Sequence, residues 1–373
     1  FAKLRYILLA WRAAERVHRE KPFTAIWAIM AAYAGVAALL FKLRHPSIPF
    51  ILTLQEGDTE KHILKRVGVF YPLWRKIFER ADHVQAISAY LADFARRHGA
   101  RCPVEVVANG VDVERFKATS DPEQLRHGAG KRQEGKTSVI ITTSRLVRKN
   151  GVDILLRAFA ELVASPTDDC SYRLVIAGDG PEEKDLKTLA GELGISGRVN
   201  FAGHVAPDDI PALLARADVF VRPSRSEGLG SSFLEAMAAG VPVIGTRVGG
   251  IPDFLTDRQT GLFAAADDFH DVAQKMRAVL SDDALRQRII ANARALVEQK
   301  YDWRMIAEQM GNIFSSARPL KDLLLATGIF PPDIGGSASY SALVAQQLPF
   351  RGYRVSVLAY GSGSGPGAHF VSR

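Results

Sequence analysis

Residues 218–262 read DVFVRPSRSEGLGSSFLEAMAAGVPVIGTRVGGIPDFLTDRQTGL, and this stretch decides the fold. A short apolar strand is expected at 219–221, followed by a loop rich in Ser and Gly and by a helix of small residues at 233–239. A turn then leads into a second strand at 243–246. Strands on either side of a crossover helix run parallel, so the stretch predicts a parallel sheet.

Two glutamates, Glu227 and Glu235, lie in this stretch, one in the loop and the other in the first turn of the helix. A helix N-terminus offers free N–H groups and the positive end of the helix dipole, so we expect an anionic group to bind there. A carboxylate on each side of that group would hold hydroxyls, and a phosphate flanked by sugars fits this description. The residues between the two glutamates that would line the site are Gly228, Gly230, Ser231 and Ser232.

The stretch resembles the signature of the retaining glycosyltransferase family with the GT-B fold that is often called family four, or glycosyl transferases group 1. The resemblance rests on the two spaced glutamates, the Gly-bearing loop, the run AMAAGVPV at 236–243 and the closing GGIP at 249–252. It implies that Glu227 holds the donor sugar and Glu235 the ribose of a nucleotide-sugar. In the alternative, Ser232 and Glu235 form a capping box that only stabilises the helix, which leaves Glu227 without a role.

Length, composition and charge limit the classes of protein and partner to be considered. A chain of 373 residues has room for two domains, and 47% hydrophobic with 24% charged residues argues against disordered and fibrous proteins. The net charge of +8 favours an anionic partner, and charge alone admits nucleoside diphosphates, anionic lipid surfaces and nucleic acid. Cys102 and Cys170 fall in different expected domains without metal-ligand spacing, so reduced thiols and a cytoplasmic setting are expected.

Two N-terminal segments raise the question of whether the protein contacts a membrane. Residue 1 opens directly into a charged helix, so no signal peptide is expected. The uncharged run at 23–41 is interpreted as a buried strand, 23–30, and an Ala-rich helix, 33–43, rather than as a membrane span. Residues 1–21 predict a basic amphipathic helix, which either packs on a sheet with a solvated basic back, the interpretation we favour, or lies on an anionic membrane surface.

The first domain continues with a strand at 49–54 and the loop LQEGDTEKH at 54–62. Ligands bind at the carboxyl ends of strands in open α/β sheets, so Glu56 and Asp58 are candidates to orient an acceptor hydroxyl or to act as a base. Relatives often carry a histidine near this strand end, whereas here Gln55 and Glu56 occupy the region. The further elements expected are a helix at 61–80, a strand at 83–88, a helix at 89–98, a strand at 104–108 and a solvated insert at 117–136.

A second domain is expected after the turn Asn109-Gly110-Val111-Asp112, which resembles the family's passage between domains. Asn109 is therefore a further candidate on the acceptor side. Strands are predicted at 138–145, 172–177, 198–202, 219–222, 243–246 and 261–264. Helices are predicted at 152–164, 181–193, 208–216, 232–239 and 268–280, which gives a doubly wound sheet.

The loop TSRLVRKNGVD at 143–153 ends the first strand of this domain. Arg145 and Lys149 resemble the family's Arg and Lys that clamp the donor diphosphate, where fixed cations would stabilise the negative charge of the leaving group. The usual lysine stands directly before the glycine, where this chain has Asn150. Lys149 would take over that role, or Arg145 would carry more of it.

Two more strand ends complete the expected nucleotide pocket. Asp179 and Gly180 would form part of its wall, and His204 and Val205 follow the strand where relatives seat the nucleobase. The sequence contains no Walker loop, dinucleotide fingerprint or Asp-x-Asp pair. The resemblance likewise implies metal-independent chemistry without a cofactor.

The end of the chain looks out of order. Residues 302–315 resemble the family's closing helix, yet 321–361 predict a strand, a loop, a helix and a second strand that resemble the opening of a family-four enzyme. In that opening, Gly335 and Gly336 are the pair that approaches the donor. Residues 369–373 predict a third strand, so the chain is interpreted as circularly permuted. An unrelated C-terminal addition is the alternative.

These observations predict an α/β protein with a GT-B fold, whose two doubly wound Rossmann-like domains face each other across a cleft. The acceptor-side domain comprises 1–112 and 321–373, the donor domain comprises 113–302, and 303–320 hold a return helix and the fused former termini. The implied function is retaining hexosyl transfer from a UDP- or GDP-sugar to a glycan or lipid-linked acceptor, with peripheral contact to an anionic membrane and no nucleic acid partner. The alternatives are a sugar-nucleotide epimerase and a non-catalytic nucleotide-sugar binder.

Overall fold

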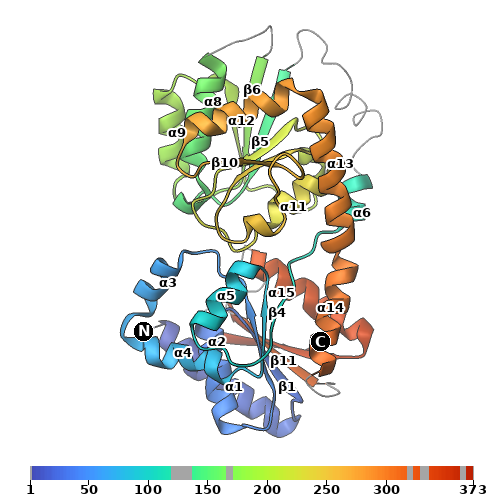
Figure 1. Cartoon of the computed structure of the whole chain (residues 1–373). Helices are drawn as coiled ribbons and strands as arrows, with labels where there is room; N and C mark the ends of the chain where they lie inside the picture. Colours follow the sequence, from blue (N-terminus) through green and yellow to red (C-terminus); the bar gives the residue numbers. More distant parts are fainter. Residues whose placement is uncertain are drawn as a thin grey trace. The chain divides into compact units, whose positions relative to one another are not determined.

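A computed structural model describes residues 2–118, 137–164, 171–316, 322–327, 336–361 and 367–372. The chain folds into two compact units, each built around its own sheet (Figure 1). The first unit comprises Phe1–Asn109 and Arg304–Arg373, and the second comprises Gly110–Trp303. The chain therefore crosses from one unit to the other twice, once after Asn109 and once after Trp303.

The sheet of the first unit has the strand order β13-β12-β11-β1-β2-β3-β4. All neighbouring strands run parallel except β13, which runs antiparallel to β12 at the edge. The expected strands are therefore present, and the mainly parallel order confirms the α/β class of this unit. The strands are β1 (Ala25–Ile29), β2 (Phe50–Leu54), β3 (His83–Ala86), β4 (Val104–Val106), β11 (Asp322–Thr327), β12 (Arg354–Gly361) and β13 (Gly367–Ser372).

The uncharged run at 23–41 lies in the centre of this unit. Every residue of β1 is buried, and β11 and β2 pair with it on its two sides. Trp27 packs its ring against Phe314 and Tyr340, and its Nε1 donates to Thr53 Oγ1 at 2.8 Å. No helix among the described residues is long and apolar enough to cross a bilayer. The interpretation of this run as a buried strand and helix is confirmed.

Strands from opposite ends of the chain are neighbours in this sheet. β11 pairs in parallel with β1, with Leu323 opposite Ala25 and Thr327 opposite Ile29. The strand-helix-strand unit expected at 321–361 is present as β11, α15 and β12, and the third expected strand is β13. The strands β11, β12 and β13 are thus part of the first unit's sheet, and the alternative of an unrelated addition is wrong for them.

The helices of the first unit cover both faces of the sheet (Figure 1). The prediction of one continuous helix at 61–80 is wrong. The structure has two helices there, because the chain breaks at Gly68, whose φ of 51° lies outside the helical region. In α1 the packed alternative is confirmed, since Tyr6, Ala10 and Ala14 are buried and the Tyr6 hydroxyl donates to the Thr327 carbonyl at 3.1 Å. The helices are α1 (Ala2–Glu20), α2 (Tyr33–Arg44), α3 (Glu60–Val67), η1 (Gly68–Phe70), α4 (Tyr71–Arg80), α5 (Ala89–Arg97), α14 (Trp303–Ser316), α15 (Gly336–Gln347) and η5 (Leu348–Arg351).

The second unit has a six-stranded, wholly parallel sheet with the order β10-β9-β8-β5-β6-β7. All six strands were expected within a few residues of their ends, which confirms the doubly wound fold. The strands are β5 (Thr137–Thr143), β6 (Ser171–Ala177), β7 (Val199–Gly203), β8 (Val219–Arg222), β9 (Val243–Thr246) and β10 (Leu262–Ala264).

One long helix of this unit, α13, was not expected from the sequence. Its buried residues Leu285, Ile289, Ala293 and Val297 recur every four positions, so a helical signal was present. The helices are α6 (Val113–Ala118), η2 (Arg148–Asn150), α8 (Val152–Ala164), α9 (Glu183–Glu192), η3 (Ser196–Arg198), α10 (Ile210–Leu214), α11 (Ser231–Ala238), η4 (Ile251–Asp253), α12 (Phe269–Ser281) and α13 (Asp283–Lys300). The insert expected at 117–136 lies mostly outside the described residues, as does Cys170, whereas Cys102 is a free, partly buried thiol.

Candidate functional site

The candidate site of the second unit lies where β8 ends and α11 begins. Gly230 is the N-cap of α11 in a left-handed conformation, and it allows the chain to turn sharply from the loop into the helix. The following loop holds this turn in place: the Gly250 N–H donates to the Glu227 carbonyl, and a Cβ on Gly249 would lie 1.7 Å from the same oxygen. The motifs at 226–230 and 249–252 are therefore in direct backbone contact.

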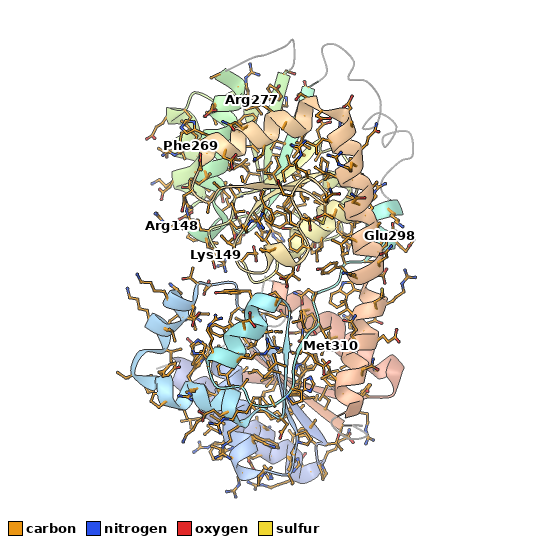
Figure 2. All side chains as sticks on the ribbon, in the orientation of Figure 1. Arg148, Lys149, Phe269, Arg277, Glu298 and Met310 are labelled. Atoms are coloured by element: carbon orange, nitrogen blue, oxygen red, sulfur yellow. The ribbon has the colours of Figure 1, made fainter. Side chains whose placement is uncertain are left out.

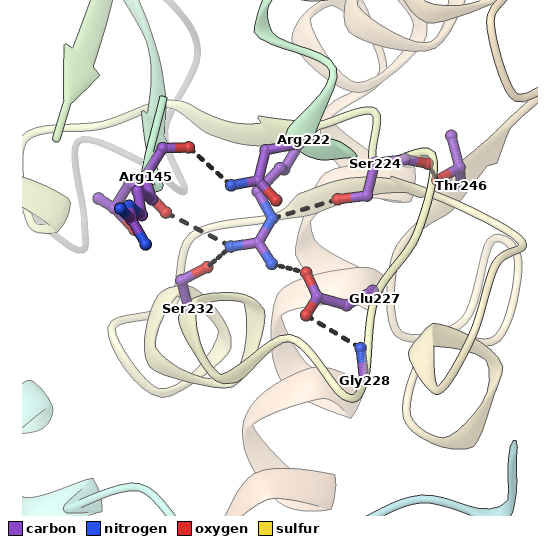
Figure 3. A network of polar contacts seen from close by, with 9 residues as sticks. Arg145, Arg222, Ser224, Glu227, Gly228, Ser232 and Thr246 are labelled. Atoms are coloured by element: carbon purple, nitrogen blue, oxygen red, sulfur yellow. Dashed lines mark hydrogen bonds and ion pairs between the residues drawn. The ribbon is translucent and has the colours of Figure 1, made fainter. Parts of the chain in front are cut away.

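Arg222 is the centre of the polar network at this turn (Figure 3). Its guanidinium is buried, donates to Ser232 Oγ at 2.6 Å and to Ser224 Oγ at 3.3 Å, and forms an ion pair with Glu227. It also lies 5.2 Å from the centroid of the Phe233 ring, within range of a cation–π contact. Burial lowers the pKa of Arg222 to about 10, although nearby Glu235 opposes this shift. The side chain is still a cation at neutral pH.

Glu227 is held at both carboxylate oxygens. Oε2 accepts from Arg222, and Oε1 accepts from the Gly228 N–H at 3.2 Å (Figure 3). Its side chain is 14% exposed, so Glu227 is not fully enclosed. A carboxylate oxygen accepts more than one hydrogen bond, which leaves capacity for hydroxyls of a bound molecule.

The capping-box alternative for Glu235 is wrong. Gly230 and not Ser232 precedes the helix, and no side chain caps it. Ser232 is the second helical residue, and its hydroxyl accepts from Arg222. Burial raises the pKa of Glu235 to about 7, while the charges of Arg222 and Arg115 act in the opposite direction. Glu235 therefore does not serve the helix end, and its carboxyl group changes protonation near neutral pH.

The loop after β5 carries the expected cations. Arg145 is exposed and Lys149 is partly buried, and Figure 2 shows Lys149 beside Arg148 at the edge of the second unit. Asn150, at the position where the resemblance implies a lysine, is buried and donates from Nδ2 to the Arg145 carbonyl at 2.7 Å. Asn150 thus shapes the loop that presents Arg145, and its side chain is not a cationic contact.

Arg225 ties the loops after β5 and β8 together. Its guanidinium forms a two-point ion pair with Asp153 at 2.8 Å and a further contact with Asp267 at 2.5 Å. The backbone N–H of Arg225 donates to the Lys149 carbonyl at 2.7 Å. These interactions raise the pKa of Arg225 and lower that of Asp153 despite its burial. The loop with Lys149 and the loop with Glu227 are therefore held in one arrangement.

The remaining donor-side candidates lie on the neighbouring strand ends. The Asp179 carbonyl accepts from the Leu146 N–H at 2.7 Å, so the turn with Gly180 lies against the loop that follows β5. His204 and Val205 come directly after β7, with His204 exposed. Because the strands are parallel, the ends of β5, β6, β7 and β8 meet at one edge of the sheet. The structure thus brings these candidates to one edge, Ser231 among them as the first residue of α11.

Arg222 is the residue that sequence reasoning missed. The signal was an arginine at the end of an otherwise apolar strand, VFVR, which reads equally well as a strand end that meets solvent. Among the residues that the structure describes, no group of three or more His, Cys, Asp or Glu side chains could hold a metal ion. In this part of the chain, the positive charge next to the glutamates comes from arginine.

The acceptor-side candidates lie in the first unit. Glu56 is buried after β2, and its Oε1 accepts from the Ala31 N–H at 2.7 Å, whereas its Oε2 has no hydrogen-bond partner among the described residues. Burial raises the pKa of Glu56 to about 7. Asp58 pairs with Arg66 at 3.3 Å, and Asn109 Oδ1 accepts from Gln55 Nε2 at 3.2 Å.

Of the two glycines near the end of the chain, Gly335 and Gly336, the structure describes only the second. Gly336 is the first residue of α15, and Gly335 lies outside the described residues. Since α15 follows β11, Gly336 belongs to the same sheet unit as Glu56.

Two protein families match the chain, one for each unit. Residues 1–115 match Glycosyltransferase Family 4, and residues 126–296 match Glycosyl transferases group 1. A GDP-mannose-dependent monoacylated alpha-(1-6)-phosphatidylinositol monomannoside mannosyltransferase of Corynebacterium glutamicum is 34% identical over 65% of this chain and 64% of that protein. An N-acetyl-alpha-D-glucosaminyl L-malate synthase of Bacillus anthracis is 33% identical over 70% of this chain and 65% of that protein. The chain thus spans just under two thirds of these two relatives.

Solved structures share the fold. A crystal structure of Anabaena Alr3699/HepE in complex with UDP and glucose has a TM-score of 0.69 at 23% identity and covers 81% of this chain and 80% of its own. A sucrose-phosphate synthase from Thermosynechococcus elongatus has a TM-score of 0.67 at 20% identity, with 82% and 76% covered. At these identities the likeness shows a common GT-B architecture of two Rossmann-like domains.

Proposed function

On the premise that residues 1–115 and 126–296 are the Family 4 and group 1 domains of a GT-B glycosyltransferase, we propose that this chain transfers a hexosyl group from a nucleoside-diphosphate sugar to an acceptor hydroxyl. Transfer would retain the anomeric configuration and need neither a metal ion nor a cofactor. The observation that supports this most is the Arg222–Glu227–Ser232 network at the start of α11, on the sheet edge that also carries Arg145 and Lys149.

The proposed roles of the donor-site residues follow from charge and position. Arg145 and Lys149 hold the diphosphate, and the first N–H groups of α11, with Gly228, Gly230, Ser231 and Ser232, support it from the helix end. Glu227 accepts hydrogen bonds from the sugar hydroxyls, and Glu235 accepts them from the ribose. Asp179, Gly180, His204 and Val205 border the nucleoside.

Arg222 is a positioning residue in this scheme. During transfer the bond between the anomeric carbon and the diphosphate oxygen breaks, and negative charge collects on the departing nucleoside diphosphate. Fixed cations that meet this charge lower the barrier because they need not reorganise during the reaction. Arg222 holds Glu227 in one orientation through their ion pair, so the hydroxyls of the sugar meet a fixed acceptor.

The donor and acceptor are proposed from the named relatives. The mannosyltransferase names favour GDP-mannose, and the UDP complex of a structural neighbour keeps UDP-sugars as the alternative. A glycan or lipid-linked hydroxyl compound is the proposed acceptor, since the mannosyltransferase of Corynebacterium glutamicum is named for a phosphatidylinositol monomannoside. Glu56, Asp58 and Asn109 are the proposed acceptor-side residues.

The experiment is a donor screen with product analysis. Thermal shift with GDP, UDP and their sugars identifies the donor, and incubation with candidate acceptors followed by NMR gives the anomeric configuration of the product. The proposal expects a retained configuration and full activity in EDTA. Binding without turnover for every acceptor would instead support the binder, and conversion of the donor alone would support the epimerase.

We also propose that residues 321–373 take the place of the first strands of the acceptor-side domain, as in a permuted order. The parallel pairing of β11 with β1 supports this. A chain in which 321–373 precede residue 1 should then keep the melting temperature and nucleotide affinity of the present one. A rearranged chain that fails to fold would contradict the permuted order.

A further inference from the structure

Three large apolar side chains of the first unit are exposed within five residues. Val69 is 88% exposed, Phe70 61% and Leu73 39%, and all three lie where η1 passes into α4. Single exposed apolar residues are common on protein surfaces, but a contiguous group of large ones usually marks an interaction site. Figure 1 shows α3 and α4 together at one flank of the first unit.

The exposure does not come from loose packing. The inner face of α4 is complete: Trp74, Ile77 and Phe78 are buried, and Trp74 Nε1 donates to the Ala31 carbonyl at 2.5 Å. Trp74 also packs against the rings of Tyr71, Phe78, Phe94 and His98. The helix is therefore anchored by one face, and the apolar side chains of the turn belong to the other.

The chain on both sides of this turn is rich in basic residues. Residues 60–80 hold six Lys and Arg but only two acids, Glu60 and Glu79, both of which are paired. Lys61, Lys65 and Lys76 are exposed and take part in no ion pair among the described residues, whereas Arg66 pairs with Asp58 and Arg75 with Glu79.

We propose that this docking surface, formed by Val69, Phe70 and Leu73 with Lys61, Lys65 and Lys76, binds the surface of an anionic phospholipid bilayer. The apolar side chains enter the boundary between headgroups and acyl chains, and the lysine ammonium groups meet lipid phosphates. Lysine is depleted at protein–protein interfaces, so the composition favours lipid over a protein partner. The basic helix α1 is the weaker candidate, because its Tyr6, Ala10 and Ala14 pack inside the unit.

The docking surface is independent of the donor site and of the proposed transfer reaction. If the acceptor is lipid-linked, binding of the first unit to the bilayer would bring the acceptor-side domain to its substrate, and only this consequence rests on the proposed function. Vesicle binding and nucleotide binding therefore test different claims.

The test is flotation of the whole protein with vesicles of phosphatidylcholine, with and without phosphatidylglycerol, at low and high salt. Wild type should float with the phosphatidylglycerol vesicles, and binding should weaken at least tenfold in high salt. Phe70→Asp and the triple change of Lys61, Lys65 and Lys76 to Gln should each lower binding at least tenfold. The controls are Val106→Asp, at a residue 48% exposed on β4, and the triple change of Arg12, Arg16 and Arg19 on α1 to Gln.

Four outcomes would overturn the proposal: wild type ignores anionic vesicles, Phe70→Asp floats like wild type, the α1 variant loses binding while the lysine variant keeps it, or light scattering shows a dimer that Phe70→Asp dissolves. A melting temperature and a nucleoside diphosphate affinity close to wild type show that a variant is folded. Should Phe70→Asp unfold, Phe70→Trp provides the second measurement, since brominated lipid should quench the new indole and a failure to quench would contradict insertion.

Discussion

Glu227 and Glu56 each follow a parallel strand, one in the sheet of each unit, and their surroundings differ in an instructive way. Glu227, after β8, is held by a buried arginine and a backbone N–H. In Glu56, after β2, Oε1 accepts from the Ala31 N–H, and Oε2 has no hydrogen-bond partner among the described residues. Burial raises the pKa of Glu56 to about 7, although backbone N–H groups and the charge of Arg66 act in the opposite direction. Glu227 is thus held by an arginine, whereas Glu56, like Glu235 of the second unit, is a buried carboxyl group whose pKa is raised to about 7.

The largest expected effect on stability and turnover comes from Arg222→Met, which removes the cation that pairs with Glu227. Glu227 would then be a poorly compensated carboxylate, and breaking a buried pair from one side costs about 3–5 kcal/mol. We expect a clear drop in melting temperature and a loss of turnover of about a hundredfold or more. Calorimetry and steady-state kinetics measure the two effects.

The double variant Arg222→Met with Glu227→Gln is the matched control. Removing both charges should restore much of the stability but none of the activity. Equal stability of wild type and Arg222→Met would show that the ion pair does not hold the loop.

The next effect is on donor binding by the second unit. Arg145→Ala should leave the melting temperature unchanged, because the side chain is exposed. Donor affinity or rate should fall about tenfold or more, since a hydrogen bond to a charged group contributes about 1.5–3 kcal/mol. Arg148→Ala, at an exposed neighbour, is the control in the same assay. Equal losses in both variants would mean that the loop only contributes general positive charge.

The comparison also predicts a pH effect in the first unit. The folded pKa of Glu56 lies above its ordinary value of 4.5, so the folded state binds the extra proton and stability falls as pH rises from about 5 to 7. Glu56→Gln keeps the shape without the titration, and its advantage over wild type should grow across that range to about 1–3 kcal/mol. Denaturant unfolding at several pH values measures it, and a constant difference between the two proteins would argue against the raised pKa.

The smallest effect concerns Asn150. Its side chain donates to the Arg145 carbonyl, so Asn150→Ala should cost about 1 kcal/mol of stability and reduce the rate less than tenfold. Lys149→Ala, measured beside it, should reduce donor affinity more. A larger loss for Asn150→Ala than for Lys149→Ala would reverse the roles assigned to the two residues.

Much of the fold could be predicted from the sequence because each sheet is built from short apolar strands separated by helices. The buried run of β1 and the strand-loop-helix unit around α11 carry this information locally. The break at Gly68 was missed, because a glycine within a helical pattern shows its positive φ only in the fold. The helix α13 was missed although its buried residues recur every four positions.

The candidate site could be predicted only in part. Motif spacing indicated Glu227 and Arg145, but the central position of Arg222 depends on the contact of its strand end with the α11 turn, which no local pattern encodes. Ser232 and Glu235 matched a capping box in spacing, yet the N-cap is Gly230, two residues before the position that the motif requires. In α1 the amphipathic pattern indicated the helix but not its buried side, which follows Tyr6, Ala10 and Ala14, whereas Leu8 is 49% exposed.

The most direct test of the central claim is a crystal structure of the protein with a nucleoside diphosphate and its sugar bound. We predict that the diphosphate contacts Arg145 and the first N–H groups of α11, with the ribose at Glu235 and the sugar hydroxyls at Glu227. A nucleotide bound elsewhere on the second unit, or one bound with both glutamates directed away from it, would contradict this account.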